Sequence, residues 1–123
     1  VGWYSLQAAI AGVHAGAETA EATDWGQIVG LYDVLAGLGR SPVVALNRAV
    51  AVAMRDGPER GLALVKELIP QLSDYHLAHA VQADLCRRLG RTREALASYR
   101  KALALSRQEP ERRFLERRIK ELA

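Results

Sequence analysis

The sequence has only one cysteine, Cys86, so it cannot form an internal disulfide. Aromatic residues make up only 6% of the chain, while half of the residues are apolar, mostly Ala, Leu and Val. Alanine has the highest helix propensity, so this composition favours closely packed helices over a β-sandwich. Prolines are also few, and each of the four stands near a predicted helix end. We expect one domain, residues 1–123, with a core of its own.

No apolar run reaches the ~18 to 20 residues that a membrane-spanning helix needs. The uncharged stretch Val1–Ala17 has the spacing of an amphipathic helix, and no basic leader precedes it. We therefore expect neither a membrane anchor nor a signal peptide. We expect a cytoplasmic protein, with which the lone Cys86 is compatible as a small core residue. Because the chain begins with Val and not Met, we also expect it to be a piece of a longer protein.

The net charge of +3 is distributed unevenly. Residues 1–40 carry a net charge of −3, residues 41–85 carry −1 and residues 86–123 carry +7. The basic end has two interpretations: it attracts an acidic partner, or it is the solvated face of a terminal helix. Composition alone favours the solvated face of a terminal helix.

Capping residues, breakers and apolar spacing together predict seven helices and no strand. Serine before proline is a strong start signal, and glycine a common end signal. The predicted helices run over 3–17, from the cap Asp24 to Gly39, from Ser41 to Gly57, from Pro58 to Pro70, from a cap at Ser73 or Asp74 to Gly90, from Thr92 through Leu105, and from Pro110 onward.

Corresponding positions in the even-numbered predicted helices recur every 33 to 34 residues. The three series are Tyr32, Val65, Tyr99; Leu35, Leu68, Ala102; and Ile28, Gly61, Ala95. A helix–turn–helix unit of 34 residues is the tetratricopeptide period. The sequence therefore predicts an all-α, tetratricopeptide-like helical repeat with about three antiparallel helix pairs and a C-terminal capping helix. Gly61 and Ala95 are expected where two helices approach closely.

Residue patterns for catalysis are missing from the sequence. It has no glycine-rich phosphate loop, no Ser–His–Asp arrangement and no obvious pair of carboxylates for acid–base chemistry. His76 and His79 are three residues apart on a predicted helix, but no carboxylate or cysteine stands at a metal-ligand interval from them. We expect no enzyme, no cofactor, no bound metal and no small-molecule substrate.

Asn47 and Arg48 interrupt an otherwise apolar helix, VVALNRAVAVA. In a helical-repeat superhelix the first helix of each unit lines the concave face, where this polar step could meet a partner's carboxylate or backbone. The alternative is that Arg48 ties two helices together through Asp33 or Asp56. Both interpretations remain open at the level of sequence.

A second candidate surface for protein contacts combines acidic and aromatic residues: Asp24, Trp25, Tyr32 and Asp33. Trp25 and Tyr32 could be exposed anchors for a partner, and the negative first third could dock a basic helix. Trp25 follows a helix cap, however, and such a residue more often packs across the helix pair.

The C-terminal run ERRFLERRIK offers a second-choice basic face formed by Arg112, Arg113, Arg117 and Lys120. Glutamates interleave the basic residues, and Glu109–Arg113 and Glu116–Lys120 have the i,i+4 spacing of helix ion pairs. Mixed signs favour the polar outer face of a capping helix over a nucleic-acid stripe.

Five strings, taken in order, resemble one protein family over Tyr4 to Ile119. They are YSLQAAIAGVHAGA, TDWGQIVGLYDVL, SPVVALNRAVAVA, YHLAHAVQADLCRRLGRTREALASYRKALAL and ERRFLERRI. In combination they are similar to the long C-terminal extension of one group of bacterial extracytoplasmic-function (ECF) RNA polymerase sigma factors. Matching motif residues are Leu6, Gln7, Ala8, His14, Asp24, Trp25, Tyr32, Asp33, Pro42, Asn47, Arg48, Tyr75, His76, Arg88, Gly90, Arg91, Arg113, Phe114 and Leu115. Gln108 departs from the family's Asn before the last helix.

The resemblance implies a tetratricopeptide-like domain that regulates or supports a sigma factor through protein contacts. Its partners would be the sigma factor's own modules, RNA polymerase or a regulatory protein. Promoter DNA would be contacted only by upstream modules that these residues do not include. The alternative is a free-standing adaptor of the same fold that binds an unrelated protein.

Overall fold

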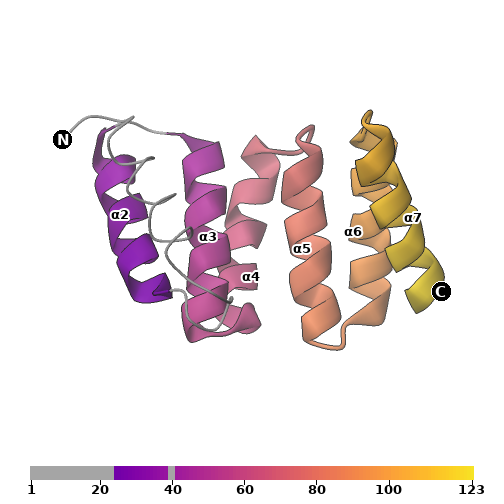
Figure 1. Cartoon of the computed structure of the whole chain (residues 1–123), viewed down its shortest axis with the longest axis horizontal. Coiled ribbons are helices and arrows are strands. Elements are labelled where there is room, and N and C mark those ends of the chain that lie inside the picture. Colours follow the sequence, from indigo (N-terminus) through magenta and orange to yellow (C-terminus); the bar gives the residue numbers. More distant parts are fainter. Residues whose placement is uncertain (1–23, 39–40) are drawn as a thin grey trace.

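The computed structural model describes residues 24–38 and 41–123, and within these ranges the protein is helical and contains no strand. The helices are α2 (Trp25–Leu38), α3 (Pro42–Asp56), α4 (Pro58–Leu68), a 3-10 turn (Ile69–Gln71), α5 (His76–Arg88), α6 (Thr92–Leu105) and α7 (Glu109–Leu122). They follow one another in chain order from α2 at one end to α7 at the other (Figure 1). The predicted all-α helical repeat is confirmed, while the predicted helix over 3–17 and the stop at Gly39 lie outside the described residues.

Several predicted helix starts are confirmed by the caps that hold them. Asp24 Oδ1 accepts a hydrogen bond from the Gln27 backbone N–H at 3.0 Å, at the start of α2. Ser41 Oγ accepts from the Val44 backbone N–H at 3.4 Å, with Pro42 at the first position of α3. These side chains satisfy backbone donors that have no partner within the helix.

The predicted cap of α5 is wrong. The residue before the helix is Tyr75, which has extended backbone angles and whose side chain accepts no capping hydrogen bond. Ser73 and Asp74 lie earlier, in a turn closed by a hydrogen bond from the Tyr75 N–H to the Leu72 carbonyl oxygen at 3.0 Å. The turn is instead held by His79, whose Nε2 donates to the Ser73 carbonyl oxygen at 2.7 Å. A buried histidine on α5 thus fixes the turn by satisfying one of its carbonyl oxygens, and no side chain caps the start of the helix.

Two further helix ends differ slightly from the prediction. The α4 helix ends at Leu68, and Pro70 falls inside the 3-10 turn, where its missing backbone N–H breaks the α-helical hydrogen-bond pattern. The α7 helix begins at Glu109, one residue before Pro110. Its N-cap, Gln108, makes no side-chain cap hydrogen bond.

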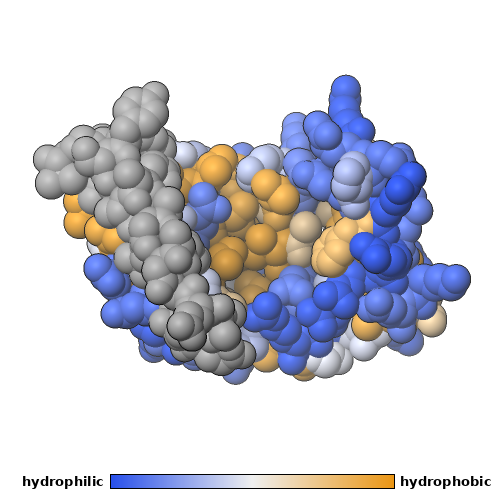
Figure 2. Space-filling model, in the orientation of Figure 1, coloured by the Kyte–Doolittle hydropathy of each residue, from blue (hydrophilic) through white to orange (hydrophobic). Residues whose placement is uncertain are grey.

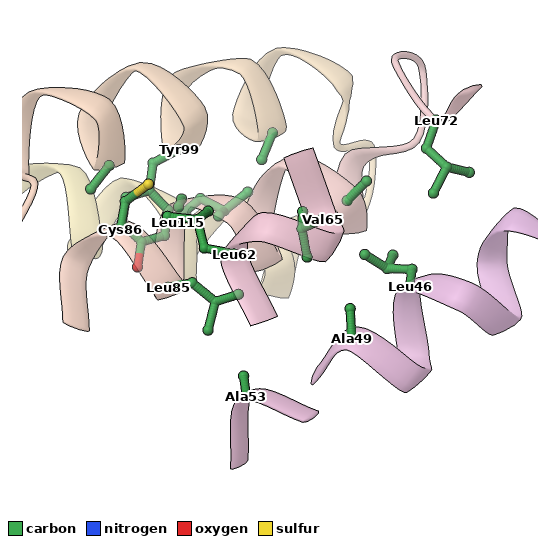
Figure 3. Close-up of a cluster of buried hydrophobic side chains, with 14 residues drawn as sticks. Leu46, Ala49, Ala53, Leu62, Val65, Leu72, Leu85, Cys86, Tyr99 and Leu115 are labelled. Carbon is green, nitrogen blue, oxygen red and sulfur yellow. The ribbon is translucent and has the colours of Figure 1, made fainter. Parts of the chain in front are cut away.

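The helices pack in consecutive pairs around two apolar clusters. The larger cluster runs from α3 to α7 and includes Leu46, Leu62, Val65, Tyr99 and Leu115, all at most 3% exposed (Figure 3). The smaller joins α2 to α3 around Ile28, Leu35 and Val52. Leu64 packs against both clusters, so the core is continuous along the repeat.

Small residues stand at the helix crossings, as the repeat period predicts. Gly61 on α4 lies so close to α3 that a Cβ there would overlap Ala53 and come within 3.0 Å of the Ala49 carbonyl oxygen. Ala95 occupies the corresponding place on α6 and is 0% exposed. One turn further on, Val65 and Tyr99 fill the space between units and are 0% and 1% exposed.

Candidate functional site

Arg48 lies on the side of α3 that faces α2. Its Nε donates to Asp33 Oδ1 at 2.6 Å, which joins α3 to α2. Asp56 is engaged elsewhere, by Arg55 at 2.8 Å and Arg60 at 3.7 Å, and the hydrogen bond from Arg55 lowers the pKa of the Asp56 carboxyl. Of the two carboxylates considered as partners of Arg48, the structure shows Asp33; Asp56 lies on α3 itself, so a pairing with it would not join two helices.

Asn47 lies on a different side of the same helix. The residues Val43, Asn47, Val50 and Met54 are spaced by four, three and four, which places them in one stripe along α3. Val50 and Met54 in this stripe line a hollow between α3 and α5. Asn47 is exposed and is the one polar member of the stripe. The Asn–Arg step is thus divided between two faces of α3.

The four acidic and aromatic residues on α2 and at its cap contribute to the fold. Asp24 caps the helix and Asp33 pairs with Arg48. Trp25 and Tyr32 are half-buried and pack against the α2–α3 cluster. Burial raises the pKa of the Tyr32 phenol above its ordinary value. Both aromatic rings keep part of their surface accessible, so a contribution to binding would come on top of a packing role.

The basic residues of α7 divide into tethered and exposed groups. Arg112 Nη1 donates to the carbonyl oxygens of Leu103 and Ser106, both at 2.9 Å, and so fixes α7 to the end of α6. Arg113 pairs with Glu109 at 3.3 Å, as the i,i+4 spacing predicts. Arg117 and Lys120 have no carboxylate within salt-bridge distance among the described residues.

A broad, open hollow lies on the outer side of α7. Its lining is Pro110, Arg113, Glu116, Arg117 and Lys120, and its volume is about 630 Å³. Three of these five side chains are basic and one is acidic. This outer face therefore carries more basic than acidic side chains on an open surface, and it is suited to an acidic protein surface rather than to an enclosed small molecule.

The two α5 histidines have separate partners. His79 holds Ser73, as described above, whereas His76 Nε2 lies 3.0 Å from Glu111 Oε2 on α7 without hydrogen-bond geometry. Within the described ranges, His, Cys, Asp and Glu form no group of three or more that could hold a metal ion.

Cys86 is a buried residue of α5 in the larger cluster. It is 0% exposed, and its thiol lies 3.6 Å from Glu94 Oε2 on α6. Burial, followed by the neighbouring Glu94 carboxylate, raises the pKa of the Cys86 thiol. A thiol that is both buried and held in its neutral form is poorly placed to act as a nucleophile.

Sequence reasoning did not identify the apolar hollows along the first helices of the units. One lies between α3 and α5 and the other between α5 and α7. Their linings are ordinary Val, Leu, Ala, Met and Phe residues, which have the same spacing as core residues. The only available signal was the 34-residue separation of Val43 and Leu77, which the structure leaves 39% and 42% exposed.

These features define a helical-repeat domain. Most of its polar candidate residues for protein contacts stabilise the fold, and the first helix of each unit (α3, α5 and α7) exposes apolar surface. No family model and no solved structure matches the sequence. A curated protein of Rhizobium meliloti (strain 1021), described as uncharacterized, is 45% identical to it over 122 residues. The match covers 99% of this chain but only 29% of that protein, so the chain spans less than a third of its relative's length. None of the helices in the described residues is long and apolar enough to cross a membrane.

Proposed function

We propose that this chain is a protein-binding regulatory domain, the C-terminal extension of an ECF-type RNA polymerase sigma factor that acts in transcription initiation. The binding role is supported by a contrast between its polar and its large apolar side chains. Polar residues such as Arg48 and Arg112 are engaged within the fold, while Val43, Leu77 and Phe114 on three first helices stay exposed. Large apolar side chains exposed along one face mark an interaction surface.

The sigma-factor assignment is supported by the ordered motif strings that run from Tyr4 to Ile119. Several motif residues have structural roles that a repeat domain needs: Asp24 and Pro42 at helix starts, Asp33 with Arg48 between helices, and Leu115 in the core. The 45% identical relative carries the matching segment within a much longer polypeptide, which is compatible with an extension. We infer a cytoplasmic location from this role.

The competing proposal is a free-standing adaptor of the same fold. Sequencing the gene upstream of Val1 separates the two, because an extension requires a sigma helix–turn–helix module in the same reading frame. A functional test compares affinity capture of RNA polymerase and sigma modules by the intact protein and by a version that lacks residues 1–123. Equal capture by both would show that the domain does not act through these contacts.

The acidic–aromatic surface is tested with Trp25→Ala and Arg48→Ala in the intact factor. If the surface docks a basic sigma helix, transcription from a reporter changes while each isolated variant melts like the parent. Because Trp25 packs on the α2–α3 cluster, a fall in melting temperature together with activity would assign it a structural role instead. Unaltered transcription with unaltered melting would remove this surface from the proposal.

A further inference from the structure

The segment that contains α6 carries charge of almost one sign. Residues 91–108 include one acidic residue, Glu94, and five basic ones, which gives a net charge of +4; the basic residues are Arg91, Arg93, Arg100, Lys101 and Arg107. The helices beside it mix both signs, since α4 has two basic and two acidic residues and α7 has five basic and four acidic ones. The strongest local excess of positive charge therefore lies on α6.

The one carboxylate of this segment is already engaged. Glu94 Oε2 lies 3.8 Å from Lys66 Nζ on α4 and accepts a hydrogen bond from the Cys86 thiol on α5 at 3.6 Å. All five basic residues of the segment are exposed, and none of them has a carboxylate within salt-bridge distance among the residues that the structure describes. Their charge is therefore available to a partner.

Two alanines run along the middle of this basic surface. Ala97 and Ala104 are exposed and stand seven residues apart, which places them nearly on one line of the helix with a separation of about 10.5 Å. Arg93 and Arg100 flank this line on one side and Lys101 flanks it on the other. These five residues are here called the α6 outer face. The buried residues of the helix lie on its opposite side: Ala95, Tyr99 and Ala102.

The α6 outer face differs from α7 in its lack of internal ion pairs. On α7, Arg113 pairs at 3.3 Å with Glu109, four residues before it. On α6, the residues four positions before and after Arg100 are Leu96 and Ala104, and the other two cations of the face likewise have apolar residues at these positions. A helix face that is only solvated gains stability from i,i+4 pairs of opposite charge. The composition of this face instead leaves its cations to carboxylates from outside the helix.

The uniformly basic surface is one helix wide. The ion pair of Lys66 with Glu94 joins α4 to α6, and α7 packs against α6 and lies in front of it in Figure 1. Both neighbouring helices carry exposed glutamates, Glu67 on α4 and Glu116 on α7. A nucleic-acid duplex, which is wider than one helix, would bring phosphates toward these carboxylates, whereas a single helix along α6 would not.

The α6 outer face is also distinct from the apolar surface of the first helices. Figure 2 shows apolar surface gathered in the middle of the face that α3 and α5 present, with hydrophilic surface toward α7. The α6 outer face has no large apolar side chain, so charge and not apolar area would select its partner.

We propose that the α6 outer face packs against an acidic helix of a protein partner, which lies along the Ala97–Ala104 line with its carboxylates on the cations beside that line. Small residues seven positions apart let two helices approach closely, and charged residues that flank such a line determine which helix is accepted. An arginine guanidinium binds a carboxylate through two parallel hydrogen bonds, which favours Arg93 and Arg100 as the main contacts. The inference concerns this surface alone and does not depend on whether the polypeptide is a sigma factor.

The test measures binding of fluorescein-labelled probes to the 123-residue protein by fluorescence anisotropy at physiological ionic strength. The first probe is a helical peptide of about 18 residues, or roughly five turns, with alanines every seven residues flanked by glutamates. The second has the same composition in a scrambled order, so that the charge is kept and the alanine line is lost. The third is a DNA duplex of random sequence, which supplies phosphates in place of carboxylates.

Two double variants remove the same charge from the two basic faces. Arg93→Gln with Arg100→Gln acts on α6, and Arg117→Gln with Lys120→Gln acts on α7, where both cations also lack a carboxylate within salt-bridge distance in the described ranges. A third variant, Ala97→Gln, fills the alanine line without a change in charge. The α6 pair is expected to weaken the helical peptide at least about tenfold, Ala97→Gln about threefold or more, and the α7 pair less than about twofold.

Circular dichroism and thermal unfolding verify that each variant is folded like the parent. The proposal is overturned by equal binding of the helical and scrambled peptides, by an equal or larger loss in the α7 pair, or by unaltered binding in Ala97→Gln, since each result would mean that the peptide does not pack along α6. Tighter binding of the duplex than of the helical peptide, lost in the α6 pair, would also overturn it, because the face would then be a phosphate-binding surface.

Discussion

Gly61 on α4 packs directly against Ala53 on α3, with no room between the two helices for a further methyl group. The Cα of Ala53 and the carbonyl oxygen of Ala49 would each lie 3.0 Å from a Cβ at Gly61, and both are backbone atoms that cannot rotate away. The two helices of this unit can approach this closely only because residue 61 has no side chain. The corresponding position in the next unit is Ala95, which is also fully buried.

Gly61→Ala is therefore expected to destabilise the protein by about 1–3 kcal/mol, although alanine is the better helix former. The matched control is Gly30→Ala on α2, where a Cβ would meet nothing within 4 Å. That variant should be more stable by about 0.5–1 kcal/mol, since it gains helix propensity without a clash. Chemical denaturation of both variants checks the pair. If both stabilise the protein, the close contact at Gly61 does not limit the helix spacing.

Most helix boundaries could be predicted from sequence because local residues determine them. The Ser41–Pro42 start and the Gly57–Pro58 junction depend on backbone preferences and one capping side chain. The start of α5 could not be predicted in this way. Both Ser73 and Asp74 are good caps, but the position of that turn depends on a hydrogen bond from His79, six residues further along the chain. The helix therefore begins after Tyr75, later than either of the two locally acceptable starts.

The candidate surfaces were predictable only in part. Arg48 was recognised as unusual because it is a charge in an apolar helix, and its pairing with Asp33 was one of the two pairings considered. The apolar hollows between α3, α5 and α7 were missed because Leu77 and Phe114, which line them, have the residue type and spacing of core positions. Their exposure depends on how far α3, α5 and α7 stand apart, which a single sequence does not specify.

The Arg48–Asp33 pair is expected to contribute modestly to stability. Its two side chains are 32% and 56% exposed, so solvent screens the attraction. A double-mutant cycle with Arg48→Ala and Asp33→Ala should give a coupling energy of about 0.2–1 kcal/mol that shrinks at high salt. Thermal unfolding of the four proteins provides the measurement. A coupling energy that does not change with salt would indicate that the pair acts through packing.

Alkaline pH is expected to destabilise the fold through Tyr99. This side chain is 1% exposed, and burial raises the pKa of its phenol above the ordinary 10.0. Because the pKa is higher in the folded state, the contribution to stability is complete below the unfolded pKa and is lost as pH rises through the folded one. The melting temperature should fall above about pH 10, and less steeply in Tyr99→Phe.

The same substitution has a cost at neutral pH. Arg87 Nε donates to the Tyr99 hydroxyl at 3.3 Å, so Tyr99→Phe should lose about 0.5–1.5 kcal/mol even where the phenol is neutral. Arg87 keeps its ion pair with Asp84, which limits the loss. Equal slopes of melting temperature against pH in parent and variant would show that other groups, such as the buried Cys86 thiol with its raised pKa, govern the alkaline transition.

DNA binding by this domain is expected to be weak and independent of sequence. The basic residues of α7 are interrupted by glutamates, and two of them are paired, Arg113 with Glu109 at 3.3 Å and Arg118 with Glu121 at 3.1 Å. That leaves Arg117 and Lys120 as the α7 cations best placed to meet phosphates, and few phosphate contacts mean low affinity that falls quickly with salt.

Anisotropy with labelled duplexes at low and physiological salt should show the same weak binding for promoter and random sequences. Arg117→Glu should weaken that binding, whereas Arg48→Ala, at the opposite end of the repeat, should leave it nearly unchanged. Tight binding at physiological salt that discriminates between the duplexes would contradict this expectation, because it would require base contacts that a charge-interrupted helix does not supply.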